Sequence, residues 1–132
     1  MIRGVESLSV EEIAVAVSDA AAKAGAGKLK RHDIEGGTLS VSNLGSYGVD
    51  QFDAIINPPQ SAILAVGCVT EQVVAKAGEF CSEARMRLSL SLDHRIIDGV
   101  EGAEFLTTIK SALENPAEWL QGTAALEQVH DG

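Results

Sequence analysis

The chain is poor in cysteine and in positive charge, and each shortage excludes a class of protein. Its 132 residues include two cysteines, Cys68 and Cys81, which have neither the spacing of a metal site nor the density of a disulfide-rich secreted domain. We therefore expect two free thiols, a reducing compartment and no metal site. Asp and Glu number 19 against 10 Lys and Arg, which gives a net charge of −9, and this acidity favours solubility.

The positive charges and the apolar residues are both dispersed. The longest basic cluster consists of Lys28, Lys30 and Arg31, so we expect no nucleic-acid partner. No apolar run approaches the ~20 residues of a membrane-spanning helix, and residues 1–10 lack the charged start and apolar centre of a signal peptide. We therefore expect no membrane association. The glycines of GSYG, at 45–48, do not have the spacing of the common phosphate-binding motifs.

A chain of this length, with 45% hydrophobic residues, is large enough for one hydrophobic core and hardly for two. It contains no internal repeat and no low-complexity segment. We therefore expect one domain over residues 1–120, followed by a C-terminal tail at 121–132, where no periodicity is evident. Strand and helix patterns alternate along the domain, as in an α/β fold.

Apolar periodicity and turn residues predict the elements of this domain. Ser9 and Glu12 form a capping-box pattern ahead of a helix that should end near Gly25. A polar connector at 28–35 follows, and the glycines and prolines of 44–60 indicate a loop with one short element. The expected elements in order are a helix from 10, strands at 38–42, 62–66 and 69–74, a hairpin turn at 76–79, a strand at 84–92, and a helix at 99–113 that stops before Pro116.

The segment DHRIIDG at 93–99 places a histidine and an aspartate four residues apart, between a strand and a helix. Apolar residues at alternate positions of 86–92 indicate a half-buried strand before it. Histidine titrates near neutral pH and acts as a general base in many enzymes, so His94 is a candidate for that role. The spacing alone leaves two alternatives open, because a lone histidine is more often structural and Asp98 could be only a helix N-cap.

Two blocks of sequence resemble one known family. DHRIIDG is similar to the DHRxxDG signature of the acyltransferase (E2) components of 2-oxoacid dehydrogenase complexes. Residues 36–67, GGTLSVSNLGSYGVDQFDAIINPPQSAILAVG, resemble the GGTFTISNLG and INPPQ segments of the same proteins, in the same order. The resemblance extends from about Ile2 to about Leu120. It covers only the later part of the family's catalytic domain, and we find no counterpart of the family's lipoyl and subunit-binding domains.

The fold that this resemblance implies is α/β and chloramphenicol-acetyltransferase-like, with a mixed sheet flanked by helices, of which this chain would be a part. The resemblance also implies a homo-oligomer built from trimers whose active sites lie between subunits. In many members the trimers form a cubic or dodecahedral core.

The same resemblance implies that the chain moves an acyl group between dihydrolipoamide and coenzyme A. A thiol with a pKa of about 8.5 is mostly protonated at neutral pH, so the reaction needs a base. His94 is the only histidine in a motif, whereas His32 and His130 lie in polar surroundings. By resemblance, Ser42 would donate a hydrogen bond to the oxyanion that forms, and Asp98 would be the second acidic residue of the catalytic motif.

Other motif positions are carried over with smaller roles. Asn43 and Gly45 would contribute to substrate binding within SNLG, Asn43 by a turn hydrogen bond and Gly45 through a positive backbone dihedral. Asp93 and Arg95 would form a structural ion pair around the histidine. In the chloramphenicol acetyltransferases the aspartate equivalent to Asp98 pairs with an arginine from an earlier part of the domain, which would lie outside this chain.

We expect acetyl as the acyl group, ahead of succinyl and branched-chain groups, because the second block is most similar to pyruvate-dehydrogenase-type members. Coenzyme A would be the co-substrate, and the lipoyl group would come from a lipoyl domain absent from this chain. The E1 and E3 components would be partners, in the cytoplasm or, in a eukaryote, the mitochondrial matrix. The alternatives are a truncated, non-catalytic core or scaffold subunit and a stand-alone acetyltransferase, which would usually carry HHxxxDG.

Overall fold

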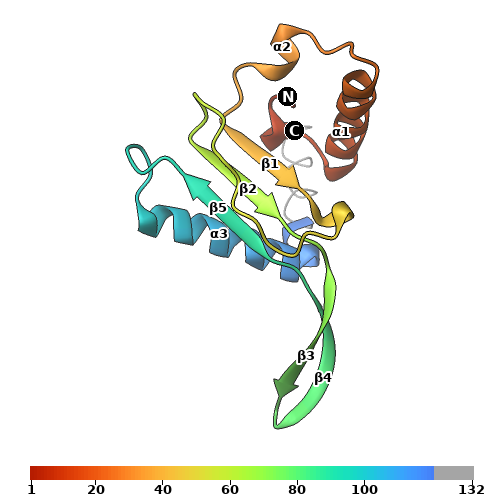
Figure 1. Ribbon diagram of the computed structural model, residues 1–132, viewed down its shortest axis with the longest axis vertical. Helices are drawn as coiled ribbons and strands as arrows, with labels where there is room; N and C mark the ends of the chain where they lie inside the picture. The colour runs from red at the N-terminus through yellow and green to blue at the C-terminus, as the bar shows by residue number, and fades with distance from the viewer. Residues whose placement is uncertain (121–132) are drawn as a thin grey trace, which may run out of the picture. The chain divides into compact units, whose positions relative to one another are not determined.

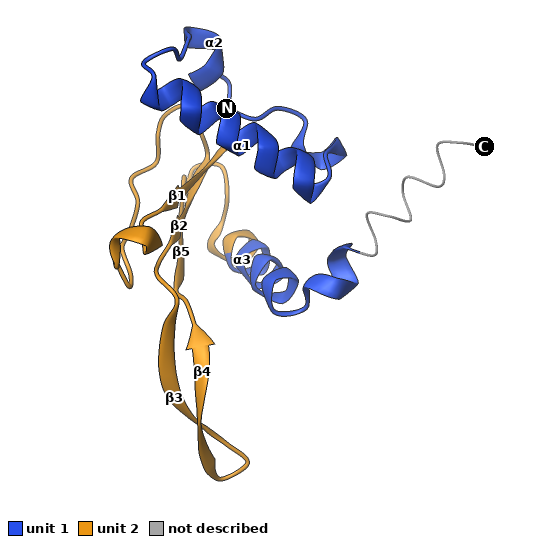
Figure 2. Ribbon diagram, turned by 90° about the vertical axis from the view of Figure 1, so that its right-hand side faces the viewer, with its two compact units in different colours: residues 1–37, 103–132 blue, residues 38–102 orange. Residues whose placement is uncertain are grey.

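The computed structural model describes residues 1–120, and the expected tail at 121–132 lies outside the described residues. The chain divides into two compact units, coloured separately in Figure 2. One contains residues 1–37 and the described residues from 103 on, and the other contains residues 38–102. All five strands of the described chain belong to the second unit.

The first unit begins with a helix whose start the sequence specifies. A 3-10 turn, η1 (Val5–Ser7), precedes helix α1 (Val10–Gly25). The Ser9 hydroxyl accepts a hydrogen bond from the Glu12 amide at 3.2 Å, and the Glu12 carboxylate accepts one from the Ser9 amide at 2.8 Å. The predicted capping box is therefore confirmed.

A four-residue helix, α2 (Arg31–Ile34), lies where the sequence pattern predicts only a polar connector. Asp33 accepts a hydrogen bond from the Lys30 amide at 2.9 Å, which lowers the pKa of the Asp33 carboxyl. At the other end, Arg3 donates to the Glu35 carbonyl at 3.1 Å. These contacts satisfy backbone groups at the helix ends, and a helix of one turn is too short to produce an apolar periodicity.

A three-stranded mixed sheet forms the centre of the second unit (Figure 1). Its strands are β1 (Leu39–Asn43), β2 (Ala62–Val66) and β5 (Leu88–Leu92). Strand β2 lies in the middle, parallel to β1 and antiparallel to β5. The core of this unit is the run 62–65 of β2, whose residues are at most 8% exposed, as the compact apolar run in the sequence predicts.

The two faces of this sheet differ in chemistry. Directly opposed residues share a face, so the register places Ser40 and Ser42 of β1 on the same face as the serines of β5. The leucines of β5 line the other face. There a Cβ atom on Gly102 would lie 2.2 Å from Cδ2 of Leu92, which means that the first turn of helix α3 (Gly99–Glu114) packs closely against β5.

Strands β3 (Thr70–Lys76) and β4 (Glu79–Arg85) form a separate antiparallel hairpin. Figure 1 shows that the hairpin runs on from the ends of β2 and β5. Its turn residues, Ala77 and Gly78, have positive φ angles of 50° and 87°, as a two-residue hairpin turn of type I′ requires. The predicted hairpin is therefore confirmed.

The single strand predicted at 84–92 is wrong, because it is two strands. Residues 86 and 87 separate β4 from β5, and residues 67–69 separate β2 from β3. A two-stranded ribbon twists more strongly than a wider sheet, so the pairing is interrupted where the hairpin leaves the sheet. The alternation of apolar and polar residues continues through this break, which is why the sequence pattern does not reveal it.

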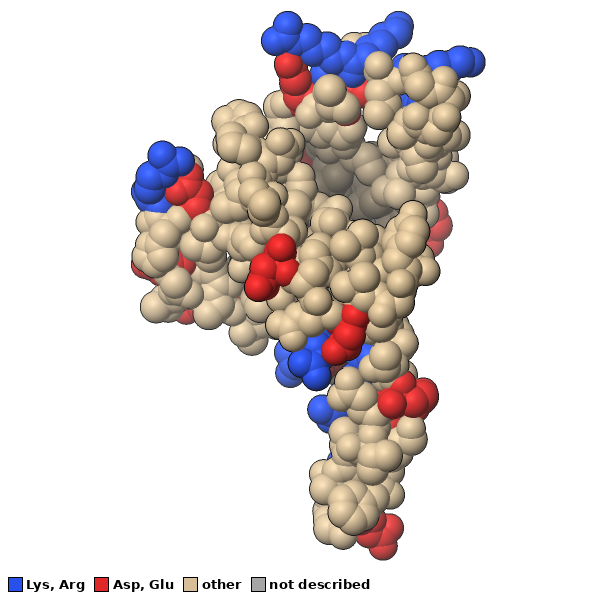
Figure 3. Space-filling model, viewed as in Figure 1, with Lys and Arg blue, Asp and Glu red and all other residues tan. Residues whose placement is uncertain are grey.

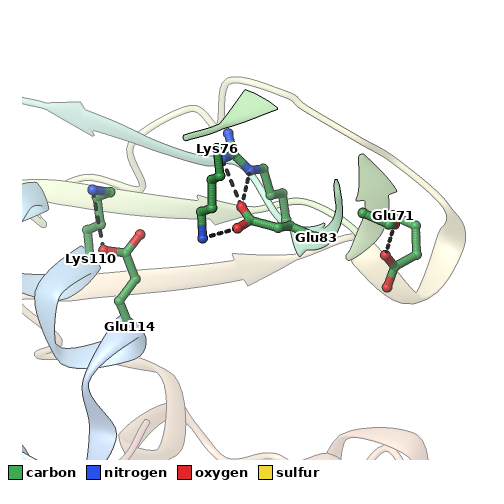
Figure 4. A network of polar contacts seen from close by, with 7 residues as sticks. Glu71, Lys76, Glu83, Lys110 and Glu114 are labelled. Atoms are coloured by element: carbon green, nitrogen blue, oxygen red, sulfur yellow. Dashed lines mark hydrogen bonds and ion pairs between the residues drawn. The ribbon is translucent and has the colours of Figure 1, made fainter. Parts of the chain in front are cut away.

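An ion pair connects the two strands of the hairpin (Figure 4). Glu83 of β4 pairs with Lys76 of β3 and, at 2.9 Å, with Arg85, and these hydrogen bonds, that of Lys76 first, lower the pKa of Glu83. On the opposite face of the hairpin, Val73 and Phe80 are 76% and 82% exposed. Figure 4 also draws the pair of Lys110 and Glu114, one turn apart on α3.

Gly67 occupies a position where three segments of the second unit meet. A Cβ atom there would lie 1.9 Å from the carbonyl oxygen of Asp50 and 3.3 Å from that of Arg87. The Gly67 amide donates to the Arg87 carbonyl at 2.9 Å. Because the surrounding atoms belong to the backbone, no side chain fits at this position without displacing the loop before β2.

We expect Gly67→Ala to lower the free energy of unfolding by about 1–3 kcal/mol or more, because overpacking forces the backbone to move. Gly25→Ala is the matched control: apart from its chain neighbours and the backbone of its own helix, nothing lies within 4 Å of its Cβ position, and alanine stabilises a helix over glycine by up to about 1 kcal/mol. Urea unfolding followed by circular dichroism measures both variants. An unchanged midpoint for Gly67→Ala would contradict the packing described.

Candidate active site

His94 follows directly after the sheet, in a turn that is anchored to the central strand. The Asp93 amide donates to the Ser61 carbonyl at 2.8 Å. The Ser61 amide in turn donates to the Thr38 carbonyl at 3.2 Å. These two bonds extend the three-stranded pairing by one row beyond its last regular residues, so the turn starts from a backbone that is held on the sheet.

The turn presents an open imidazole. The amides of Ile96 and Ile97 donate to the Asp93 carbonyl at 2.9 and 3.0 Å, which folds residues 93–97 back on themselves. His94 is exposed and, within the described residues 1–120, forms no hydrogen bond or ion pair. It is therefore not a buried histidine satisfied by neighbouring groups, and its ring nitrogens are accessible to a ligand.

Asp93 and Arg95 form the ion pair expected around the histidine. Nε of Arg95 donates to Oδ1 of Asp93 at 2.9 Å, and Nη2 donates to Oδ2 at 2.7 Å, which is a bidentate geometry. The Arg95 amide also donates to Oδ1, at 3.1 Å. These bonds, those of the Arg95 side chain first, lower the pKa of Asp93 to about 2 and raise the pKa of Arg95.

Asp98 caps helix α3. Its Oδ1 atom accepts hydrogen bonds from the amides of Val100 and Glu101 at 2.8 and 2.9 Å, and the Glu101 carboxylate accepts one from the Asp98 amide at 3.0 Å. This arrangement is a capping box. Asp98 could be a catalytic group or a helix N-cap. The geometry supports the N-cap, because Oδ1 already accepts hydrogen bonds from two amides of the helix.

The SNLG segment begins in the last two residues of β1 and continues beyond the strand. Ser42 is half-buried, and the Asn43 side-chain oxygen accepts a hydrogen bond from the Gly45 amide at 2.9 Å, so the predicted turn bond is confirmed. The positive φ predicted for Gly45 is wrong, and Gly48 has it instead, at 76°. Glycine is needed at position 45 because a Cβ atom there would lie 2.7 Å from the Gly67 carbonyl oxygen.

The sheet keeps Ser42 and His94 apart within one chain. Ser42 lies in the same row of opposed residues as Ser89, three rows from Leu92, and His94 lies beyond Leu92. Three rows correspond to about 10 Å along the strands, and two strand spacings add about 9.6 Å across the sheet. The two backbones are therefore more than about 14 Å apart, which is too far for the side chains to share a hydrogen bond.

Other titratable groups of the described chain lie outside this turn. His32 is exposed in α2, 3.4 Å from Asp33, and His130 lies outside the described residues. Both cysteines are free, as predicted.

Within residues 1–120, no group of three His, Cys, Asp or Glu side chains is placed to hold a metal ion, and no helix has the length and apolarity to cross a membrane. On the face drawn in Figure 3, Lys and Arg side chains gather over α2 and are otherwise scattered.

Two residues that organise this region, Glu101 and Ser61, are not among the residues predicted from the sequence. Glu101 follows Asp98 by three residues, the same spacing as Ser9 and Glu12, so the capping-box pattern could have identified it. Ser61 has no comparable signal. It contributes a backbone carbonyl, and strand register, not residue type, determines which amide that carbonyl meets.

Comparison with known proteins identifies related chains along almost the whole length. The family model for the 2-oxoacid dehydrogenases acyltransferase (catalytic domain) matches residues 1–121. The dihydrolipoyllysine-residue acetyltransferase component of the mitochondrial pyruvate dehydrogenase complex of Schizosaccharomyces pombe is 44% identical over 121 residues, 89% of this chain and 25% of the relative. The dihydrolipoyllysine-residue succinyltransferase component of the 2-oxoglutarate dehydrogenase complex of Rickettsia typhi is 44% identical over 120 residues, 91% of this chain and 30% of the relative.

Solved structures have the same fold. A dihydrolipoamide acetyltransferase of Azotobacter vinelandii was studied for the role of a serine, a histidine and an asparagine in its catalytic mechanism. It matches with a TM-score of 0.79 and 35% identity, over 85% of this chain and 46% of that one. The cubic core of a pyruvate dehydrogenase multienzyme complex matches with a TM-score of 0.79 and 34% identity, over 85% and 46%. The predicted fold class is confirmed, and the chain spans about half of each solved structure.

We expect Asp98→Ala to lower the free energy of unfolding by about 1 kcal/mol, because α3 loses its N-cap. Asp98→Asn is the matched variant: asparagine caps helices about as well as aspartate, so the change should be a few tenths of a kcal/mol at most. Thermal unfolding of the two variants measures the difference. If Asp98→Asn is as unstable as Asp98→Ala, the cap is not the role of this side chain.

Proposed function

The chain belongs to the family of 2-oxoacid dehydrogenase acyltransferase catalytic domains, and on this basis we propose that it moves an acyl group between dihydrolipoamide and coenzyme A. The observation that carries the proposal is the exposed His94 imidazole on a turn bonded to the sheet. A thiol with a pKa of about 8.5 is mostly protonated near pH 7. A neutral imidazole is the ordinary side-chain base for such a proton.

In the proposed reaction His94 takes the proton of the attacking thiol as sulfur bonds to the thioester carbonyl carbon. The carbonyl oxygen becomes a tetrahedral oxyanion. When the intermediate collapses, the bond to the other sulfur breaks and the leaving thiolate receives the proton from His94. One thioester and one thiol are consumed and one of each is formed, so atoms and charge balance and His94 returns to its starting state.

The oxyanion needs a hydrogen-bond donor placed before the reaction begins, and we assign it to the Ser42 hydroxyl. Within one chain the strand register places the backbones of Ser42 and His94 more than about 14 Å apart. The serine of a neighbouring copy would therefore complete each site. The cubic core of a pyruvate dehydrogenase complex, whose structure this chain matches, supports an assembly of several copies.

The Azotobacter vinelandii enzyme supports this choice of residues. Its serine, histidine and asparagine have the same spacing along the chain as Ser42, His94 and Asp98. Asparagine and aspartate share the ability to cap a helix, and Asp98 does so here. We therefore assign Asp98 the role of holding the start of α3 next to the His94 turn, rather than a share in proton transfer.

The substrates follow from the proposed chemistry. Coenzyme A would be one thiol and a lipoyl group on a separate domain the other, with Asn43 and Gly45 shaping the loop next to Ser42. We propose acetyl as the acyl group, and the two relatives of equal identity, one an acetyltransferase and one a succinyltransferase, make succinyl the alternative. The proposed partners are lipoyl domains and the E1 and E3 components, in the cytoplasm or the mitochondrial matrix.

His94→Ala should reduce acyl transfer from acetyl-CoA to dihydrolipoamide by about 10²–10⁴-fold, since a general base typically contributes that much. His32→Ala is the matched control, because His32 is also exposed and should leave the rate unchanged. Size-exclusion chromatography checks that both variants assemble like the unaltered protein. Equal rates for His94→Ala and the unaltered protein would contradict the proposed mechanism.

Mixing two inactive variants tests whether neighbouring copies share a site. Ser42→Ala alone should lose about 10²–10³-fold in rate, as the loss of an oxyanion donor usually does. Chains with Ser42→Ala that are unfolded and reassembled with chains carrying His94→Ala should regain part of the activity, because some interfaces then contain both groups. Activity no greater than the average of the separate variants would place both groups within one copy.

A further inference from the structure

Asp93 uses every one of its polar groups to hold the turn around His94. Its amide donates to the Ser61 carbonyl of the sheet, and its carbonyl accepts from the amides of Ile96 and Ile97. Both carboxylate oxygens accept hydrogen bonds from Arg95. Asp93, before His94, is thus bonded to the sheet, and Arg95, after it, is bonded to Asp93.

The His94 side chain itself has no such contact within the described chain. Without hydrogen bonds to the ring, the direction of the imidazole depends on the backbone that carries it. That backbone is fixed by bonds between the two residues that flank His94. The Arg95 amide donates to Oδ1 of Asp93 at 3.1 Å, and the Arg95 side chain donates to both oxygens of the same carboxylate. Loosening the pair would let the residue between them rotate.

We propose that Asp93 is a positioning residue, which holds His94 in its reactive orientation by pairing with Arg95 across it. The inference deepens the proposed function and rests on it. Asp93 touches neither substrate nor the reacting atoms in this account. Its effect is geometric, and a displacement of about 1 Å at a reacting group can cost about 10²-fold in rate.

The charge state of Asp93 agrees with this role. Its pKa of about 2, against an ordinary value of 3.8, means that the folded turn favours the carboxylate. A lowered pKa of this kind contributes stability that is fully present above the ordinary value and is lost as the pH falls toward about 2. The pair therefore stays charged over the whole range in which a neutral histidine could act as a base.

Three substitutions in the assembled protein separate positioning from other roles. Asp93→Asn keeps an acceptor for the Arg95 amide and removes the ion pair, and Arg95→Gln removes the pair from the other side. Arg87→Gln is the matched control, since Arg87 makes an exposed ion pair with Asp50 at 3.4 Å just before β5. For each variant, kcat and KM for coenzyme A are measured together with amide hydrogen exchange at Ile96 and Ile97.

We expect Asp93→Asn to lower kcat by about 10–100-fold, to leave KM within about twofold, and to speed exchange at Ile96 and Ile97 at least tenfold. Arg95→Gln should act in the same direction, and Arg87→Gln should change nothing. A loss of kcat without faster exchange, or faster exchange without a loss of kcat, would overturn the positioning role. If the unaltered protein transfers no acyl group, the proposed function fails; if it does and Asp93→Asn does equally well, only the positioning role fails.

Discussion

Strand β2 is hydrogen-bonded along both edges, and the arrangement of the candidate site depends on that double pairing. Its neighbour β1 is parallel and its neighbour β5 is antiparallel, and its residues 62–65 form the buried core of the unit. Because the two neighbours run in opposite directions, the carboxyl end of β1, with Ser42, and the carboxyl end of β5, before His94, lie at opposite ends of the sheet. The register separates the two groups that we assign to the proposed acyl transfer, so the proposed site needs a second copy.

Around His94 the order resides in the backbone and not in contacts to the ring. The bond from the Asp93 amide to Ser61 continues the sheet into the turn, and the capping box of Asp98 and Glu101 starts α3 immediately after it. A general base must exchange its proton with substrates, so its ring nitrogens have to remain open. A turn held between a sheet and a helix provides an open ring with a defined position, which suits the proposed role.

Local patterns in the sequence predicted the parts of the fold that depend on neighbouring residues. The capping box at Ser9, the hairpin turn and the buried strand at 62–66 are confirmed, since each depends on residues a few positions apart. The break between β4 and β5 and the short helix α2 were not predictable, because sheet twist and contacts from distant residues such as Arg3 produce them. Gly45 shows the same limit. The sequence motif identifies it as a notable glycine, but a glycine is needed there because the Gly67 carbonyl approaches it closely.

In the proposed assembly each site is formed by His94 of one copy and Ser42 of a neighbour. A structure of the assembled protein with coenzyme A bound measures this most directly, as the distances from the bound thiol to the nearest His94 imidazole and the nearest Ser42 hydroxyl. We expect both groups to reach the reacting atoms and to come from different copies. Finding coenzyme A bound away from His94, or both groups of one copy at the same thiol, would contradict it.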